Sequence, residues 1–291
     1  VLMVFAILRT LIRHQTGAML GAILFAIHPL QVESVAWMSG LKDVLGSMFA
    51  LIALWCYVQF ALSDAGVNLC TNHDSTEEGE PLTANARYGF YAAGAFFLIL
   101  GMLSKPSVMT LPVIAGCIDR LLLRRSWRDA IVSAGIWQIV IMPLMWIAQF
   151  AQPATGVPQS PLWARPLIAF DSIAFYIGKL ILPMHLAVDY GRTAQRVIDS
   201  GVMWWTMLVP LALGAVVLLA RKDLKEALPA FLVFIIAPLP TLGFKTLLFS
   251  LYSTVSEHYV YLAMLGPALL TAALVKKYGR NATVVASLVL C

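Results

Sequence analysis

The sequence has 291 residues, of which 60% are hydrophobic and only 12% are charged, and its formal net charge is +5. A soluble domain carries roughly 25% charged residues to cover its surface, so this composition excludes a soluble globular protein and predicts a chain surrounded by a lipid bilayer. The basic residues form short clusters between apolar runs and no stripe with interleaved aromatic residues, which excludes nucleic acid as a partner.

Apolar segments of about 20 residues, the length that crosses a bilayer as a helix, follow one another along the chain. We predict spans at 17–38, 42–62, 88–104, 107–123, 129–150, 202–220, 228–244 and 259–275, and a ninth that begins at 281. The stretch 167–183 carries Asp171 and Lys179, which favours a re-entrant or interfacial helix. The sequence therefore predicts an all-α polytopic transmembrane bundle that forms a single domain over 1–291. Its apolar ends indicate an internal fragment of a longer protein.

The basic clusters predict one orientation of the bundle. They lie at 9–13, 124–128, 221–225 and 276–280, and positive charge gathers at the cytoplasmic ends of spans. The polar loop 63–87 then also faces the cytoplasm. The segment 151–201 and the connections around residues 28–43, 104–107 and 245–258 lie on the outer face.

Ionisable and aromatic residues gather in these outer connections. A charge inside the hydrocarbon costs roughly 2.5–3.5 kcal/mol on insertion scales, so such residues are candidates for function. Other interpretations stay open, since the aromatic residues could form an interfacial belt, and Lys42 with Asp43 or Asp119 with Arg120 could simply neutralise each other. The candidates are His28, Glu33, Lys42, Asp43, Lys105, Lys179, His185, Asp189, Tyr190, Arg192, Glu257, His258, Tyr259 and Tyr261. A mixed acid–base pocket of this kind suits a lipid with an anionic head, because Lys and Arg bind phosphate.

Four segments carry a family resemblance. They are LFAIHPLQVESVAWMSGLKDVLGSMFALIALWCYV (24–58), LSKPSVMTLPVIAGCIDRLLL (103–123), IAFYIGKLILPMHLAVDY (173–190) and SEHYVYLAMLG (256–266). Their order and spacing resemble the membrane portion of the tetratricopeptide-repeat transmembrane O-mannosyltransferases and their bacterial relatives, which are glycosyltransferases of the GT-C class. The resemblance covers most of residues 17–275 and implies a polyprenyl-phosphate-linked sugar as the donor.

The resemblance also implies roles for individual residues. Lys105 and Lys179 would contact phosphate, Lys42 and Asp43 would hold the shape of their loop, and the family pattern includes Tyr176, Tyr190 and Tyr259. The candidate catalytic residues Glu33, Glu257 and His258 would orient or polarise groups near the sugar. His258 stands where the family typically has Arg, and a neutral imidazole would hold a phosphate more weakly. The catalytic acidic residue and the metal contact of the class lie in a first outer loop, which we expect ahead of this chain, so a divalent metal ion is a possible cofactor.

Three functional hypotheses follow. The leading one is a glycosyltransferase in a bacterial inner membrane that transfers a sugar to a protein or glycan acceptor on the outer face. The second is a non-catalytic scaffold or accessory subunit that works with other membrane subunits. The third is a lipid transporter, which would show inverted repeats with broken helices, and the sequence has no such repeat.

Overall fold

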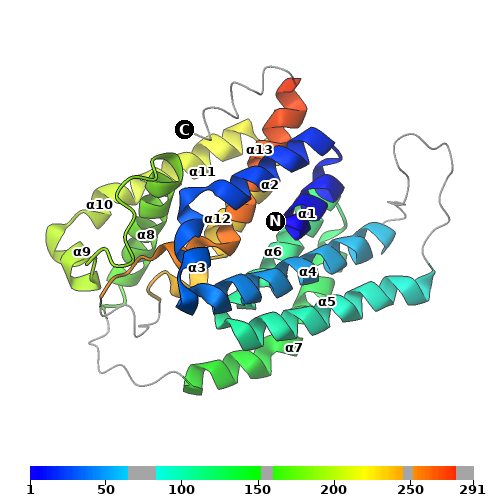
Figure 1. Cartoon of the computed structure of the whole chain (residues 1–291), viewed down its shortest axis with the longest axis horizontal. Coiled ribbons are helices and arrows are strands. Elements are labelled where there is room, and N and C mark those ends of the chain that lie inside the picture. The colour runs from blue at the N-terminus through cyan, green and yellow to red at the C-terminus, as the bar shows by residue number, and fades with distance from the viewer. Residues whose placement is uncertain (65–82, 152–159, 245–251, 280–291) are drawn as a thin grey trace.

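The computed structural model describes residues 1–64, 83–151, 160–244 and 252–279, and these residues form helices joined by short connections, without a β-strand (Figure 1). The α-helices are α1 (Leu2–Ile12), α2 (Gln15–Ile27), α3 (Val32–Ala36), α4 (Leu41–Asp64), α5 (Ala84–Ser104), α6 (Leu111–Ile118), α7 (Trp127–Ala151), α8 (Ala164–Ile181), α9 (Ala194–Ser200), α10 (Met203–Thr206), α11 (Leu208–Ala220), α12 (Ala227–Ile236) and α13 (Leu265–Tyr278). Short 3₁₀ or π turns are η1 (Pro29–Gln31), η2 (Met38–Gly40), η3 (Pro106–Thr110), η4 (Asp119–Leu123), η5 (Leu239–Thr241), η7 (Glu257–Val260) and η8 (Leu262–Met264). The all-α prediction is confirmed.

Five helical stretches in the described part are long and apolar enough to cross a membrane: Met38–Asp64, Ala84–Ser104, Pro106–Leu123, Trp127–Ala151 and Met203–Ala220. They match five of the predicted spans, but the predicted count of nine is not confirmed. The stretch predicted at 17–38 bends by 55° between α2 and Pro29–Ala36. The stretch predicted at 228–244 overlaps the shorter apolar helix Ala227–Thr241. In the stretch 259–275, two 3₁₀ turns come before α13. The segment from 281 and most of the loop 63–87 lie outside the described residues.

Two motifs with proline end helices α2 and α5. His28 caps α2 in an extended conformation before Pro29, and its side chain accepts a hydrogen bond from the Leu30 amide. Lys105, also extended, separates α5 from Pro106 and η3. A residue before proline is disfavoured in the α region, so both motifs place a polar side chain at the end of a helix.

Small residues allow the N-terminal and C-terminal helices to meet. Helix α2 runs beside α13 (Figure 1). A Cβ atom on Gly17 would lie 2.6 Å from the Ala272 carbonyl oxygen, and one on Gly21 would lie 2.4 Å from that of Ala268. Closely packed helices in membranes use such pairs of small residues four positions apart. This contact brings α13, and with it η7, against the first helices of the chain.

A buried polar network ties the helices together at the other end of α4. The Asp119 carboxylate accepts a hydrogen bond from the Tyr57 hydroxyl at 3.0 Å and pairs with Arg125 at 2.6 Å. Arg125 also pairs with Asp64 at 2.5 Å. The expectation that Asp119 pairs with Arg120 is therefore wrong, because Arg124 takes a left-handed conformation that ends η4 before Arg125.

Helix α8 does not qualify as a span, in agreement with the prediction for 167–183. Its Asp171 is buried and pairs with Arg192 at 2.6 Å, and Thr206 donates a hydrogen bond to the same carboxylate. The buried charge therefore joins α8 to the segments that follow it. The interfacial or re-entrant position of α8 stays a prediction.

Candidate functional site

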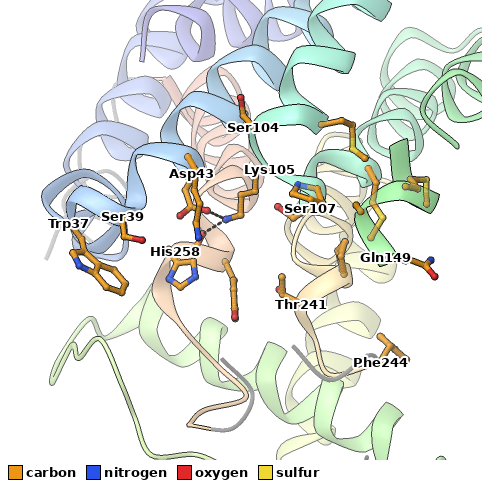
Figure 2. Close-up of a pocket in the computed structure, with 18 of the residues that line it drawn as sticks. Trp37, Ser39, Asp43, Ser104, Lys105, Ser107, Gln149, Thr241, Phe244 and His258 are labelled. Carbon is orange, nitrogen blue, oxygen red and sulfur yellow. Dashed lines mark hydrogen bonds and ion pairs between the residues drawn. The ribbon is translucent and has the colours of Figure 1, made fainter. Parts of the chain in front are cut away.

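A cavity of about 650 Å³ opens at the end of the bundle where α4 begins and α5 ends (Figure 2). Its walls come from η2, α4, α5, η3, α7, η5 and η7, so segments far apart in the sequence meet there. The lining residues are Trp37, Ser39, Lys42, Asp43, Met102, Ser104, Lys105, Pro106, Ser107, Met109, Met145, Ala148, Gln149, Pro240, Thr241, Phe244, Tyr252, His258 and Tyr259. Apolar and aromatic walls with a few convergent polar groups are typical of a small-molecule site, and the volume lies within the usual range of roughly 300–1,000 Å³.

An ion pair between Asp43 and Lys105 lies at the wall of this cavity (Figure 2). The Asp43 side chain is 2% exposed and that of Lys105 is 14% exposed. Lys105 Nζ also donates a hydrogen bond of 3.2 Å to the His258 carbonyl oxygen. Asp43 therefore pairs across the site with Lys105, and the expectation that it neutralises its neighbour Lys42 is wrong, because successive residues of a helix point in different directions.

The neighbouring Lys42 is exposed and lines the same cavity. Burial lowers the pKa of the Lys105 ammonium group to about 7, and the positive charge of Lys42 also acts to lower it while Glu33 acts to raise it. The two cations are thus close enough to repel each other. An anion that enters the cavity would relieve this repulsion.

A second ionic contact holds His258 at the cavity. Its Nδ1 lies 2.6 Å from the Glu33 carboxylate, and its backbone amide donates a 3.1 Å hydrogen bond to the same group. The Ser256 hydroxyl lies 3.0 Å from Glu33 Oε1. With a proton on Nδ1 bonded to the carboxylate, the lone pair of a neutral imidazole is at Nε2. Glu33 thereby selects the tautomer that can act as a base.

Tyr176 and Tyr259 support this arrangement. The buried Tyr176 hydroxyl donates a 3.2 Å hydrogen bond to the Ser256 carbonyl oxygen and accepts one of 3.1 Å from the Ser256 amide. The Tyr259 ring packs against the imidazole of His258 with the ring centroids 4.4 Å apart. The conformation at the start of η7, and hence the position of His258, is fixed by contacts from α8 and from η7 itself.

The remaining predicted residues form a neighbouring cluster and do not line the cavity. Glu257 is hydrogen-bonded to the Tyr190 hydroxyl, and burial raises the pKa of both groups. Lys179 Nζ lies 5.0 Å from the centroid of the Tyr190 ring and donates to the carbonyl oxygens of Met184 and His185. The His28 Nε2 atom lies 3.1 Å from the Leu180 carbonyl oxygen.

Eleven of the candidate residues therefore fall into two groups. Lys42, Asp43, Lys105, His258 and Tyr259 line the cavity, whereas Glu33, Tyr176, Glu257, Tyr190, Lys179 and His28 lie around them. Lining residues that were not predicted include Gln149, Thr241 and Tyr252. Gln149 stands at the end of a predicted span, so its sequence position gave no signal that it would face a cavity. Trp37 lies in a connection predicted to face outward, where an interfacial belt was the open alternative, and Tyr252 was not singled out from the sequence.

The described residues contain no group of three or more His, Cys, Asp or Glu side chains arranged to hold a metal ion. Within this part of the chain, the acidic side chains at the site are engaged by Lys105, His258 and Tyr190. The residues present do not by themselves fit a divalent cation.

The chain is similar to a curated protein of Caenorhabditis elegans named Protein O-mannosyl-transferase F38B6.6. The two are 26% identical over 268 residues, which cover 88% of this chain and 34% of that protein. The chain thus spans about a third of the length of this relative. No family model and no solved structure matches the chain. The apolar helices indicate an integral membrane protein. The partial similarity supports no more than a distant glycosyltransferase-like relationship. A bacterial inner membrane is not supported by these findings.

Proposed function

We propose that this chain forms the donor-lipid site of a membrane glycosyltransferase that uses a polyprenyl-phosphate-linked sugar. The observation that carries the proposal is the juxtaposition of Lys42, Lys105 and the Glu33–His258 pair at one cavity between membrane-spanning helices. The two lysines would hold the phosphate of the donor, and the aromatic side chains of Trp37 and Tyr259 would enclose the sugar.

We assign each of these side chains a step in the proposed reaction. His258 takes the proton of the acceptor hydroxyl, and the Glu33 carboxylate stabilises the imidazolium that forms. The acceptor oxygen bonds to the anomeric carbon while the bond from that carbon to the phosphate oxygen breaks. The electron pair leaves with the polyprenyl phosphate, whose charge Lys42 and Lys105 stabilise. An acidic residue in a preceding loop, as the resemblance implies, would be the alternative proton acceptor.

The Lys42→Ala variant is expected to bind a polyprenyl-phosphate sugar about tenfold more weakly, because one charge-assisted contact is lost. Lys42 is exposed and has no structural partner among the described residues, so the melting temperature should stay unchanged. The measurement is the Kd of the purified protein for the lipid-linked sugar. Lys222→Ala, at an exposed lysine outside the cavity lining, is the matched control. Equal Kd values for the two variants would contradict the donor assignment.

Donor binding is also expected to weaken as pH rises through about 7. Lys105, whose pKa is lowered to about 7, then loses its proton and with it the charge that attracts the phosphodiester. The bound anion favours the protonated form, so affinity is highest below this pKa and falls by up to about tenfold per pH unit above it. The charged groups that face Lys105 are Lys42, Asp43 and Glu33, and the backbone carbonyl oxygen of His258 accepts a hydrogen bond from it. In a Lys105→Met variant, the Kd for the donor should no longer change with pH near 7. A Kd of the parent protein that is constant between pH 6 and 9 would contradict the assignment of Lys105 to the donor phosphate.

One observation favours the scaffold as a second candidate. Asp43 is paired with Lys105 and Glu33 is hydrogen-bonded to His258 within the protein, as they would be in a network that only stabilises the fold. A purely structural network predicts that the network can be replaced by neutral side chains without loss of function. The double variant Asp43→Asn/Lys105→Met tests whether the Asp43–Lys105 pair is only structural, and a parent protein that transfers no sugar would favour the scaffold.

A further inference from the structure

A second cavity of about 640 Å³ lies along α6, α7 and α12. The first cavity meets the start of the helical stretch Pro106–Leu123, whereas the second follows the rest of it toward its other end. The lining residues are Pro112, Val113, Gly116, Cys117, Arg120, Leu121, Trp127, Ala130, Ile131, Ala134, Gly135, Gln138, Leu228 and Leu232. This groove is apolar along its length and contains one charged residue, Arg120.

The groove opens on a side of the bundle that meets lipid. The span that contains α7 is only 22% buried inside the protein, and Val113, Ile131 and Trp127 at the groove are exposed. Apolar side chains exposed on a span contact the acyl chains of the membrane. Small residues of α6 and α7 line the groove, and Gly116 lets the two helices approach closely, since a Cβ atom there would lie 3.1 Å from that of Ala134. The cavity volume is therefore room for a chain of methylene groups along the helices.

Arg120 stands at the end of the groove beside the start of α7. Its guanidinium carbon lies 4.9 Å from the centroid of the Trp127 ring. Its Nε is buried and has no hydrogen-bond partner in the described part of the chain. A buried donor without a partner costs free energy, and a guanidinium group binds phosphate through paired hydrogen bonds.

The charges around Arg120 favour an anion. Arg124 and Arg128 are exposed nearby in the sequence, whereas Asp119 pairs with Arg125 and Asp129 is bonded to Ser126. The neighbouring carboxylates are therefore already engaged. The first turn of α7 adds the partial positive charge of a helix N-terminus.

We propose that this groove binds an anionic membrane phospholipid, with one acyl chain along the cavity lined by α6, α7 and α12 and the phosphate headgroup at Arg120 and Trp127. The site is separate from the donor cavity and does not depend on the proposed glycosyl transfer. It would fix α6 against α7 through a lipid, at the end of the bundle where the basic residues gather.

Gly135 provides a variant that fills the groove without disturbing the protein. A Cβ atom at Gly135 would meet no heavy atom within 4 Å. A leucine there is also a better helix former than glycine. The matched control is Gly89→Leu in α5, where an added Cβ also meets nothing within 4 Å and which does not line the groove.

The experiment is native mass spectrometry of the purified 291-residue chain with equal amounts of phosphatidylglycerol and phosphatidylcholine that carry the same acyl chains. The parent protein and the Gly89→Leu variant should retain more phosphatidylglycerol than phosphatidylcholine. Gly135→Leu should lose the bound lipid, and Arg120→Gln should bind phosphatidylglycerol about tenfold more weakly, since a charge-assisted contact is removed.

Equal retention of the two lipids by the parent would overturn the assignment of the headgroup. Unchanged retention by Gly135→Leu would overturn the groove as the site. Because Gly135→Leu leaves all charged groups in place, its result stands even where Arg120→Gln fails to fold.

Discussion

The His258→Ala variant is expected to transfer sugar from a polyprenyl-phosphate donor about 10²- to 10⁴-fold more slowly than the parent, the usual contribution of a general base. The donor should still bind, because Lys42 and Lys105 remain in the cavity. The measurement is kcat and KM with a radiolabelled lipid-linked sugar, in membranes that carry the full-length protein. A fall confined to kcat indicates a group that acts in the transition state.

Two carboxylate variants separate a catalytic role of His258 from a structural one. Glu33→Gln keeps a hydrogen bond to the imidazole but removes the charge that stabilises the imidazolium, so an intermediate loss of kcat is expected. Glu257→Gln changes a carboxylate that contacts Tyr190 and does not line the cavity, and a much smaller effect is expected. If His258→Ala kept the parent rate, the proton acceptor would lie elsewhere, as the resemblance to the family implies.

The helical class and five of the spans could be predicted from the sequence, because twenty-residue apolar runs have few alternatives in a bilayer. The predicted count of spans is not confirmed, and two of the predicted spans differ where the apolar runs contain turn-forming residues. His28-Pro29 bends the first predicted span, and Pro238 with Pro240 interrupts the one at 228–244. Mean hydropathy is an average over about twenty residues, so it does not detect a proline that ends or bends a helix.

The gathering of the ionisable residues could also be expected from their positions in neighbouring connections. Their pairing could not, since it depends on side-chain direction. Asp43 and Lys42 are adjacent in the sequence, yet Asp43 meets Lys105 while Lys42 stays exposed. The contact of Glu33 with His258 joins residues 225 positions apart, and only the packing of η7 against α3 creates it. In the same way, Asp119 pairs with Arg125 and not with the predicted partner Arg120.

The Asp43→Asn variant is expected to destabilise the protein by roughly 3–5 kcal/mol, because it leaves the Lys105 ammonium group buried without its counter-charge. Lys105 can escape part of this cost by losing its proton. With its pKa already lowered to about 7, the loss of stability should be smaller at pH 8.5 than at pH 6. Chemical or thermal unfolding of the purified protein in detergent at the two pH values measures the difference.

The double variant Asp43→Asn/Lys105→Met removes both charges and should recover most of the lost stability, since a buried ion pair can often be replaced by neutral side chains of similar volume. Its activity then reports on Lys105 alone. If Lys105 holds the donor phosphate, the refolded double variant remains inactive in sugar transfer although it is as stable as the parent. If the pair only supports the fold, transfer returns together with stability, and the lysine has no place in the chemistry. A stable but inactive double variant would therefore place Lys105 in the chemistry, because stability and transfer respond to different atoms of the same ion pair, whereas a parent protein that transfers no sugar would favour the scaffold.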